Sequence, residues 1–128
     1  MGLVHNLYCF YGSLRKGHKN NILLEEAEYI ETKRIPGYSL YDYGPFPLAV
    51  KTNNMSESIT VELYKIHDYY SMNKIDLMEI SAGYYIDFVT VGKENFKIFL
   101  IPGGNHLARY TKIPSGDWTA YCKMKGKK

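Results

Sequence analysis

The stretch "LYCFYGSLRKGHKNN", residues 7–21, contains the end of an apolar run and an abrupt change to polar residues. Strand-forming residues fill Leu3–Tyr11 and stop at Gly12, so we expect the first strand there, in a central position of a sheet. The turn Gly12-Ser13-Leu14 follows. Such a turn is often only structural, but its backbone N–H groups suit a carboxylate or an oxyanion, and glycine permits close approach to the backbone. The next polar side chains are interpreted as a solvated edge of the loop: Lys16, His18 and Lys19.

Periodicity predicts two helices and several short strands in the rest of the chain. Helical spacing predicts a short helix that opens at Asn20 or Asn21, and a second over Asp68–Ile80 with Asp68 or Ser71 as its N-cap. From Pro102 onward, Gly and Pro predict an extended arm that packs Trp118 onto the core, with Ser115 capping a last short turn. The predicted further strands cover residues 29–35, 38–43, 46–51, 58–66, 84–91 and 96–101.

The order of these elements favours antiparallel pairing, because neighbouring strands are linked by short turns. We therefore expect an α+β fold: a small mixed, mainly antiparallel β-barrel, closed or nearly closed, with two flanking helices. An open α+β sheet is the alternative. The length of 128 residues fits a single domain over 1–128, with the extended arm from about 102 and a basic tail at 123–128.

Composition excludes several function classes. With 45% hydrophobic and 23% charged residues, the chain has the composition of a soluble globular protein. No apolar run approaches the ~20 residues of a spanning helix, and the N-terminus does not resemble a signal peptide, so we expect no membrane partner. Part of the net charge of +3 lies in the tail "KMKGKK", which is interpreted as a solvated end, so no nucleic-acid partner is expected.

Cysteine and histidine spacing predicts no metal site. Cys9 and Cys122 lie far apart, and none of the 4 histidines pairs with another at a ligand spacing. We expect a cytoplasmic location with no disulfide, and Cys9 buried in its strand.

Glu79 is the second unusual residue. It lies near the end of the apolar helix "IDLMEI", where the negative end of the helix and the apolar neighbours would both raise the pKa of its carboxyl. A raised pKa suits a general acid/base. A solvent-exposed glutamate that shares a polar face with Asp76 is an equally good interpretation of the local pattern.

Taken together, these segments resemble the γ-glutamylcyclotransferase-like family, which includes the γ-glutamylamine cyclotransferases and the plant avirulence-induced proteins. "YGSLR", "GYSLYDYGPFPLAV", "VELYKI" and "IDLMEISAGYY" follow the order and spacing of the family over roughly Leu7 to Val91, with a fainter match in "IPSGDW". The resemblance implies a small mixed β-barrel with flanking helices and one open cavity. It also implies release of 5-oxoproline from a γ-glutamyl compound, without metal or cofactor.

The resemblance also assigns roles to residues. The Tyr-Gly-Ser-Leu loop of the family binds the γ-glutamyl moiety through its backbone, and the acid/base of the family is a glutamate after an Ile/Leu-Asp-x-x-Glu helix. Glu79 therefore corresponds to the catalytic residue, and the substrate is a small γ-glutamyl molecule. The substrate-binding loop corresponds to Tyr11, Gly12, Ser13 and Leu14.

Three positions depart from the family pattern. Val61 replaces a glycine common in the family, and Ile86 and Asp87 follow "GYY" where many members have an arginine. Because these positions are expected next to the pocket, the choice of substrate stays open. The alternative that the chain is a catalytically silent relative, which binds a small ligand or a partner protein, also stays open. We expect Tyr84 or Tyr85 either to line the cavity or to have only a structural role in the sheet. The sequence gives no indication of an oligomeric state.

Overall fold

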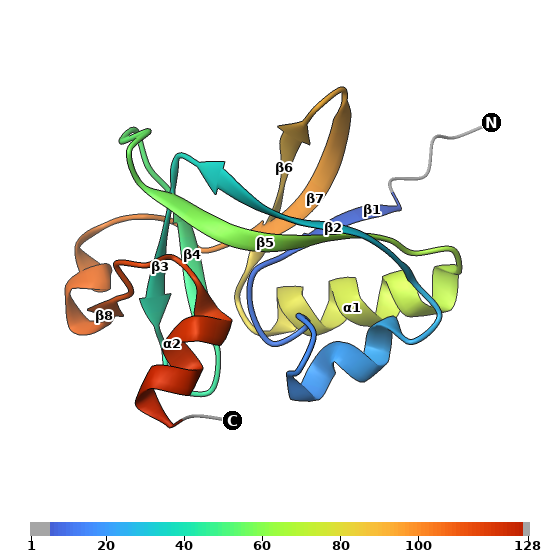
Figure 1. Ribbon diagram of the computed structural model, residues 1–128, viewed down its shortest axis with the longest axis horizontal. Coiled ribbons are helices and arrows are strands. Elements are labelled where there is room, and N and C mark those ends of the chain that lie inside the picture. Colours follow the sequence, from blue (N-terminus) through green and yellow to red (C-terminus); the bar gives the residue numbers. More distant parts are fainter. Residues whose placement is uncertain (1–5, 127–128) are drawn as a thin grey trace.

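The computed structural model describes residues 6–126, in which the strands form two sheets (Figure 1). The strands are β1 (Leu7–Phe10), β2 (Glu28–Pro36), β3 (Tyr38–Asp42), β4 (Pro47–Lys51), β5 (Ser58–Lys65), β6 (Tyr85–Val91), β7 (Glu94–Leu100) and β8 (Thr111–Lys112). The α-helices are α1 (Tyr69–Ser81) and α2 (Trp118–Lys125), and two 3-10 helices are η1 (Lys19–Leu24) and η2 (Asn105–Arg109).

The larger sheet has the strand order β2-β5-β1-β7-β6, and the smaller has the order β4-β3-β8. Among the strand pairs of the described residues, the pairing of β1 with β7 is parallel and the others are antiparallel. The predicted α+β fold with mainly antiparallel strands is therefore confirmed. The expected barrel closure is wrong, because within residues 6–126 no strand ladder joins the two sheets.

Gly37 is the corner at which the chain leaves the larger sheet for the smaller one. It separates β2 from β3 by a single residue and has a φ of 85°, a backbone conformation that favours glycine. Its N–H donates to the Glu57 carbonyl oxygen at 2.8 Å, and its own carbonyl accepts from the Thr52 N–H at 2.9 Å. This sharp change of direction starts a second sheet where a barrel would need one continuous strand.

β1 occupies the centre of the larger sheet, as predicted, between β5 and β7. Its side chains at Tyr8, Cys9 and Phe10 are buried. The strand begins at Leu7, and the part of the prediction over Leu3–His5 lies outside the described residues. Because β1 is buried on both faces, the turn that follows it begins in the interior of the molecule.

Helix α1 follows β5 and lies along the larger sheet, beside η1 (Figure 1). The predicted N-cap Asp68 is confirmed, since its carboxylate accepts a hydrogen bond from the Ser71 N–H at 2.9 Å. Met72 and Ile75 are the buried residues of the helix. The short helix expected at Asn20 or Asn21 is the 3-10 helix η1. In the described part of the chain, no helix has both the length and the apolar character needed to cross a bilayer.

The segment after Pro102 contains η2, β8 and α2, so the expectation of an extended arm is corrected. Trp118 is buried as predicted, with 2% of its surface exposed. The N-cap of α2 is Asp117, whose carboxylate accepts from the Ala120 N–H at 3.1 Å, and Ser115 is not the cap. The start of the basic tail is thus helical to Lys125, and residues 127–128 lie outside the described chain.

A buried ion pair attaches the loop after β1 to the sheet. Arg15 and Glu62 are 5% and 4% exposed, and the Arg15 Nε donates to the Glu62 carboxylate at 3.0 Å. The Lys16 N–H donates to the second oxygen of Glu62 at 2.9 Å. Arg15 also pairs with Asp117 at 2.9 Å, so the loop, β5 and the start of α2 share one charged cluster.

Replacing one partner of this ion pair should destabilise the protein strongly. We expect Glu62→Gln to lower the free energy of unfolding by about 3 kcal/mol, because the Arg15 guanidinium would remain buried beside an uncharged amide. Urea denaturation measures the change. The control is Glu28→Gln, which removes an exposed glutamate 3.5 Å from His67 and should cost less than about 1 kcal/mol. Equal small losses in both variants would contradict a structural role for the buried pair.

Candidate active site

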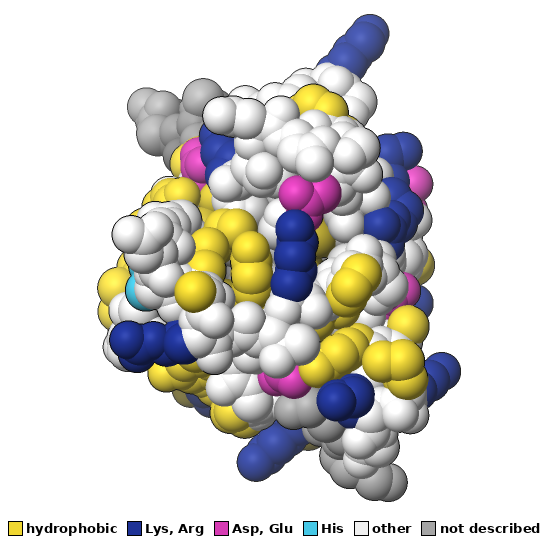
Figure 2. Space-filling model, turned by 90° about the vertical axis from the view of Figure 1, so that its left-hand side faces the viewer, with side chains coloured by type: hydrophobic (Ala, Val, Ile, Leu, Met, Phe, Trp, Pro, Cys, Tyr) yellow, Lys and Arg dark blue, Asp and Glu magenta, His cyan; other side chains and the backbone are white. Residues whose placement is uncertain are grey.

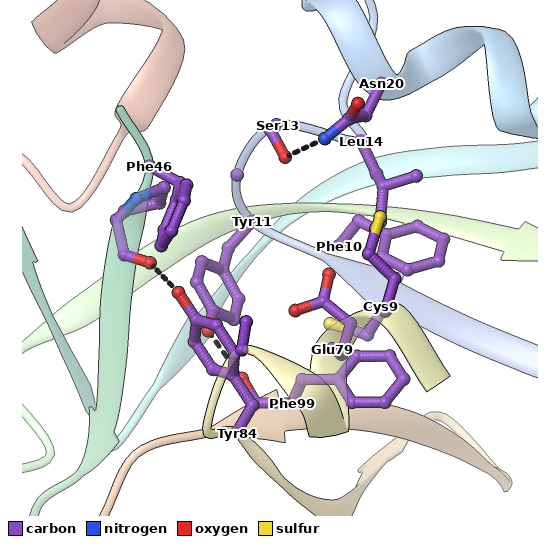
Figure 3. A pocket seen from close by; sticks show the side chains of 14 residues that line it. Cys9, Phe10, Tyr11, Ser13, Leu14, Asn20, Phe46, Glu79, Tyr84 and Phe99 are labelled. Atoms are coloured by element: carbon purple, nitrogen blue, oxygen red, sulfur yellow. Dashed lines mark hydrogen bonds between the residues drawn. The ribbon is translucent and has the colours of Figure 1, made fainter. Parts of the chain in front are cut away.

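A pocket opens where the loop after β1 meets the end of α1 and the start of β4 (Figure 3). Its empty space, counted with the open mouth, is about 550 Å³. The lining residues are Cys9, Phe10, Tyr11, Gly12, Ser13, Leu14, Asn20, Phe46, Pro47, Met78, Glu79, Ala82, Tyr84 and Phe99.

The structure brings Glu79 and the Tyr11–Leu14 loop to this one pocket. Glu79 enters from the last turn of α1, and the Tyr11–Leu14 loop faces it from the end of β1. Tyr84 also lines the pocket, whereas Tyr85 is 40% exposed and does not. Two segments far apart in the sequence therefore form opposite walls of a single cavity.

The three positions that depart from the family pattern are not among the lining residues. Val61 is fully buried within β5. Ile86 is half-buried on β6, and Asp87 forms an ion pair with Lys51 at 3.4 Å. Ile86 is paired across the strands with Phe99, which does line the pocket, so it lies beside the pocket without lining it.

The Glu79 side chain is half-buried and points toward the centre of the pocket (Figure 3). Burial, with a smaller contribution from the negative charge of Asp76, raises the pKa of its carboxyl to about 7. Within residues 6–126, no group donates a hydrogen bond to this carboxylate. The carboxyl can therefore accept or donate a proton near neutral pH, and the interpretation of Glu79 as a solvent-exposed surface residue is wrong.

Asp76, one helical turn before Glu79, is turned toward the sheet. Its carboxylate accepts from the Tyr8 hydroxyl at 2.9 Å and pairs with the Lys97 ammonium at 2.8 Å. The Lys97 side chain is only 11% exposed. This contact joins α1 to β1 and β7, and it places a positive charge against the carboxylate nearest to Glu79 along the helix. The sequence interpretation missed Lys97, although a lysine inside the apolar run "NFKIFL" is unusual for a buried strand.

Two tyrosines form a fixed wall of the pocket. The Tyr11 hydroxyl donates to the Phe99 carbonyl oxygen, and the Tyr84 hydroxyl donates to the Pro47 carbonyl oxygen at 2.7 Å. Burial, and after it nearby groups that include Glu79, raises the pKa of both phenols well above the usual range. Both hydroxyls therefore stay protonated at neutral pH, and each already uses its single hydrogen.

The Gly12–Leu14 loop has its carbonyl groups occupied and its N–H groups available. The three carbonyl oxygens accept hydrogen bonds from the Arg15 N–H, the Asn20 N–H and the Asn21 side chain. The three N–H groups make no hydrogen bond within residues 6–126. Successive free N–H groups beside a cavity are suited to a carboxylate or an oxyanion.

Gly12 is required by its contact with Pro47. A Cβ atom at this position would lie 2.8 Å from the Pro47 Cγ, closer than side chains tolerate. Glycine therefore lets the loop lie against the start of β4, which closes this side of the pocket. We predicted that Gly12 would let a ligand lie close to the backbone. In the structure, it is the Pro47 ring that lies close to it.

The basic residues after the loop lie outside the pocket. Lys16 and Lys19 are exposed as expected, and the Lys16 ammonium lies 3.3 Å from the centre of the Tyr29 ring. His18 differs from the expected solvated edge, because it is half-buried and its Nε2 lies 2.8 Å from the Thr119 hydroxyl. Burial and the neighbouring Arg15 lower the pKa of its ring.

Both cysteines are buried, and within residues 6–126 they form no disulfide. Cys9 lines the pocket, and burial raises the pKa of its thiol above the usual range. Over residues 6–126, no group of three His, Cys, Asp or Glu side chains is arranged to hold a metal ion.

Comparisons with known proteins give one family. The model of the family described as "Gamma-glutamyl cyclotransferase, AIG2-like" matches residues 8–120. A curated relative from Pyrococcus horikoshii, named "Putative gamma-glutamylcyclotransferase PH0828", is 34% identical over 108 residues, which cover 84% of this chain and 86% of the relative. The crystal structure of PH0828 superimposes with a TM-score of 0.77 at 27% identity, and the match covers 94% of this chain and 95% of PH0828.

Two further solved structures share the fold. YkqA from Bacillus subtilis gives a TM-score of 0.76 at 30% identity, covering 98% of this chain and 44% of YkqA. An AIG2-like protein from Mus musculus gives a TM-score of 0.70 at 15% identity, covering 88% of each chain, and so supports the fold alone. The family match spans most of the chain, including both walls of the pocket, and the chain belongs to the gamma-glutamyl cyclotransferase, AIG2-like family.

Proposed function

We propose that the protein is a γ-glutamyl cyclotransferase that converts a γ-glutamyl compound to 5-oxoproline and a free amine. The observation that carries the proposal is the position of Glu79, a carboxyl with a pKa of about 7, opposite the available N–H groups of Gly12–Leu14. Membership in the family supports a reaction of this class. The substrate carries its own nucleophile, so the proposed chemistry requires no metal or cofactor.

The proposed reaction begins with ionised Glu79 removing a proton from the α-ammonium group of the substrate. The free α-amine then attacks the γ-carbonyl carbon, forming the ring C–N bond and a tetrahedral intermediate. Protonated Glu79 donates to the departing nitrogen as the original C–N bond breaks. The ring nitrogen gives up its second proton through the same carboxylate, and the released amine takes it up, so Glu79 returns to its ionised form.

Three physical factors favour this reaction in the pocket. A carboxyl with a pKa near 7 populates both protonation states at neutral pH, which the two proton transfers require. Ring closure is intramolecular, so holding the substrate folded removes much of the entropic barrier. The Gly12–Leu14 N–H groups would bind the α-carboxylate or the developing oxyanion, and each such donor is typically worth about 3 kcal/mol in the transition state.

Glu79→Gln should abolish turnover and leave the fold intact. Because an amide cannot transfer the proton, we expect kcat to fall by about 10²–10⁴-fold. Release of 5-oxoproline from a panel of γ-glutamyl amines and γ-glutamyl amino acids, followed by mass spectrometry, measures the loss. Glu94→Gln, at an exposed glutamate of β7, serves as the matched control and should retain activity. Substantial turnover by Glu79→Gln would exclude Glu79 as the acid/base.

The same substitution should stabilise the protein above neutral pH. The pKa of Glu79 is about 7 in the folded protein and about 4.3 in an unfolded chain, so the folded state binds the proton more tightly between these values. Stability therefore falls as the pH rises through this window. We expect Glu79→Gln to exceed the wild type in free energy of unfolding by about 1–3 kcal/mol at pH 8, and by nearly nothing at pH 4.

Urea denaturation at both pH values tests this prediction, again with Glu94→Gln as the control. If the free energies of unfolding of Glu79→Gln and the wild type differ by the same amount at pH 4 and pH 8, ionisation of the Glu79 carboxyl does not destabilise the folded protein.

A further inference from the structure

We propose that the group released from the γ-glutamyl moiety is an aromatic amine without a carboxylate. This inference rests on the proposed function and specifies the substrate class of the same pocket. It follows from the charges of the lining residues, from the hydrogen-bond donors that they offer, and from the aromatic side chains that continue outward from one wall.

The pocket offers no positive charge to a second carboxylate. Glu79 is its only carboxyl, and none of the lining residues is Lys, Arg or His. The buried cations of the neighbouring elements are already paired, Arg15 with Glu62 and Lys97 with Asp76. A leaving group that carried its own carboxylate would therefore meet the charge of Glu79 without a compensating cation.

The hydrogen-bond donors that the pocket offers are all uncharged. The Tyr11 and Tyr84 hydroxyl hydrogens are committed to the Phe99 and Pro47 carbonyl oxygens. The backbone donors that remain are the N–H groups of the Gly12–Leu14 loop, which suit the α-carboxylate or the oxyanion of the γ-glutamyl part. The side-chain donors are the Ser13 hydroxyl and the Asn20 amide, which already donates one hydrogen to the Ser13 oxygen. A second carboxylate on the leaving side would therefore meet neutral donors and no cation.

Aromatic side chains extend from the pocket wall to the surface. The Phe46 ring lines the pocket, the Tyr43 ring lies 5.4 Å from it, and the Tyr110 ring lies 5.3 Å from Tyr43. Tyr43 is 46% exposed. Figure 2 looks onto the side of the molecule where β8 lies and shows hydrophobic side chains gathered there. An aromatic leaving group could pack against these rings, and such contacts are worth about 0.5–1.5 kcal/mol each.

Three matched substrates test the inference: γ-glutamyl benzylamide, γ-glutamyl phenylglycine, which adds a carboxylate to the carbon between the nitrogen and the same ring, and γ-glutamyl ethylamide, which lacks the ring. We expect kcat/KM for the benzylamide to exceed that for each of the others by about tenfold. Equal or faster turnover of γ-glutamyl phenylglycine, or equal turnover of the ethylamide, would overturn the inference and leave the proposed cyclotransferase activity intact. Absence of 5-oxoproline from all three would overturn both.

A matched pair of variants locates the preference. Phe46→Leu keeps an apolar side chain but removes the ring from the pocket wall, so the ratio of kcat/KM between benzylamide and ethylamide should fall severalfold, through a higher KM for the benzylamide. Phe88→Leu makes the same change at a 41% exposed position on β6, away from the lining residues, and should keep the wild-type ratio. An unchanged ratio in Phe46→Leu would overturn the role assigned to the aromatic wall.

Discussion

The ion pair between Arg15 and Glu62 sets the position of the loop on which the candidate site depends. Glu62 lies in β5, which is held between β1 and β2, so its carboxylate is a fixed point of the larger sheet. The carboxylate binds both the Arg15 side chain and the Lys16 backbone at once. Because either charge would be costly to bury alone, alternative positions of the loop are disfavoured. The N–H groups of Gly12–Leu14 are thereby held beside the cavity.

A second buried ion pair positions the opposite wall. Lys97 of β7 pairs with Asp76 of α1, and Tyr8 of the central strand donates to the same carboxylate. These contacts attach the final turns of α1 to the sheet, so Glu79 projects from a helix whose distance from β1 is fixed. The pairing also opposes the negative charge of Asp76, which leaves burial as the main reason for the high pKa of Glu79. The pocket thus lies between two networks of buried charges.

Local patterns in the sequence predicted the helix and the strands whose formation depends on neighbouring residues. Alternation located β5, and the apolar spacing located α1 together with its N-cap Asp68. The polar turn after an apolar strand and the glutamate among apolar neighbours were weak local signals, and only the family resemblance joined the two segments in one predicted site. Features that depend on distant residues were missed: the partners of Arg15 lie on β5 and before α2, and the cap of α2 shares its carboxylate with that arginine. Barrel closure failed for a similar reason, since the change of direction at Gly37 depends on contacts with Thr52 and Glu57.

Glu79 and the Gly12–Leu14 loop, if they form one γ-glutamyl site, should bind the proposed product, 5-oxoproline, between them. A crystal structure of the protein with 5-oxoproline would reveal this arrangement. We expect the product carboxylate or its ring carbonyl oxygen to accept hydrogen bonds from the loop N–H groups, with the ring nitrogen within hydrogen-bond distance of the Glu79 carboxyl. Binding of 5-oxoproline outside this pocket, or with its ring nitrogen turned away from Glu79, would show that these residues do not form such a site.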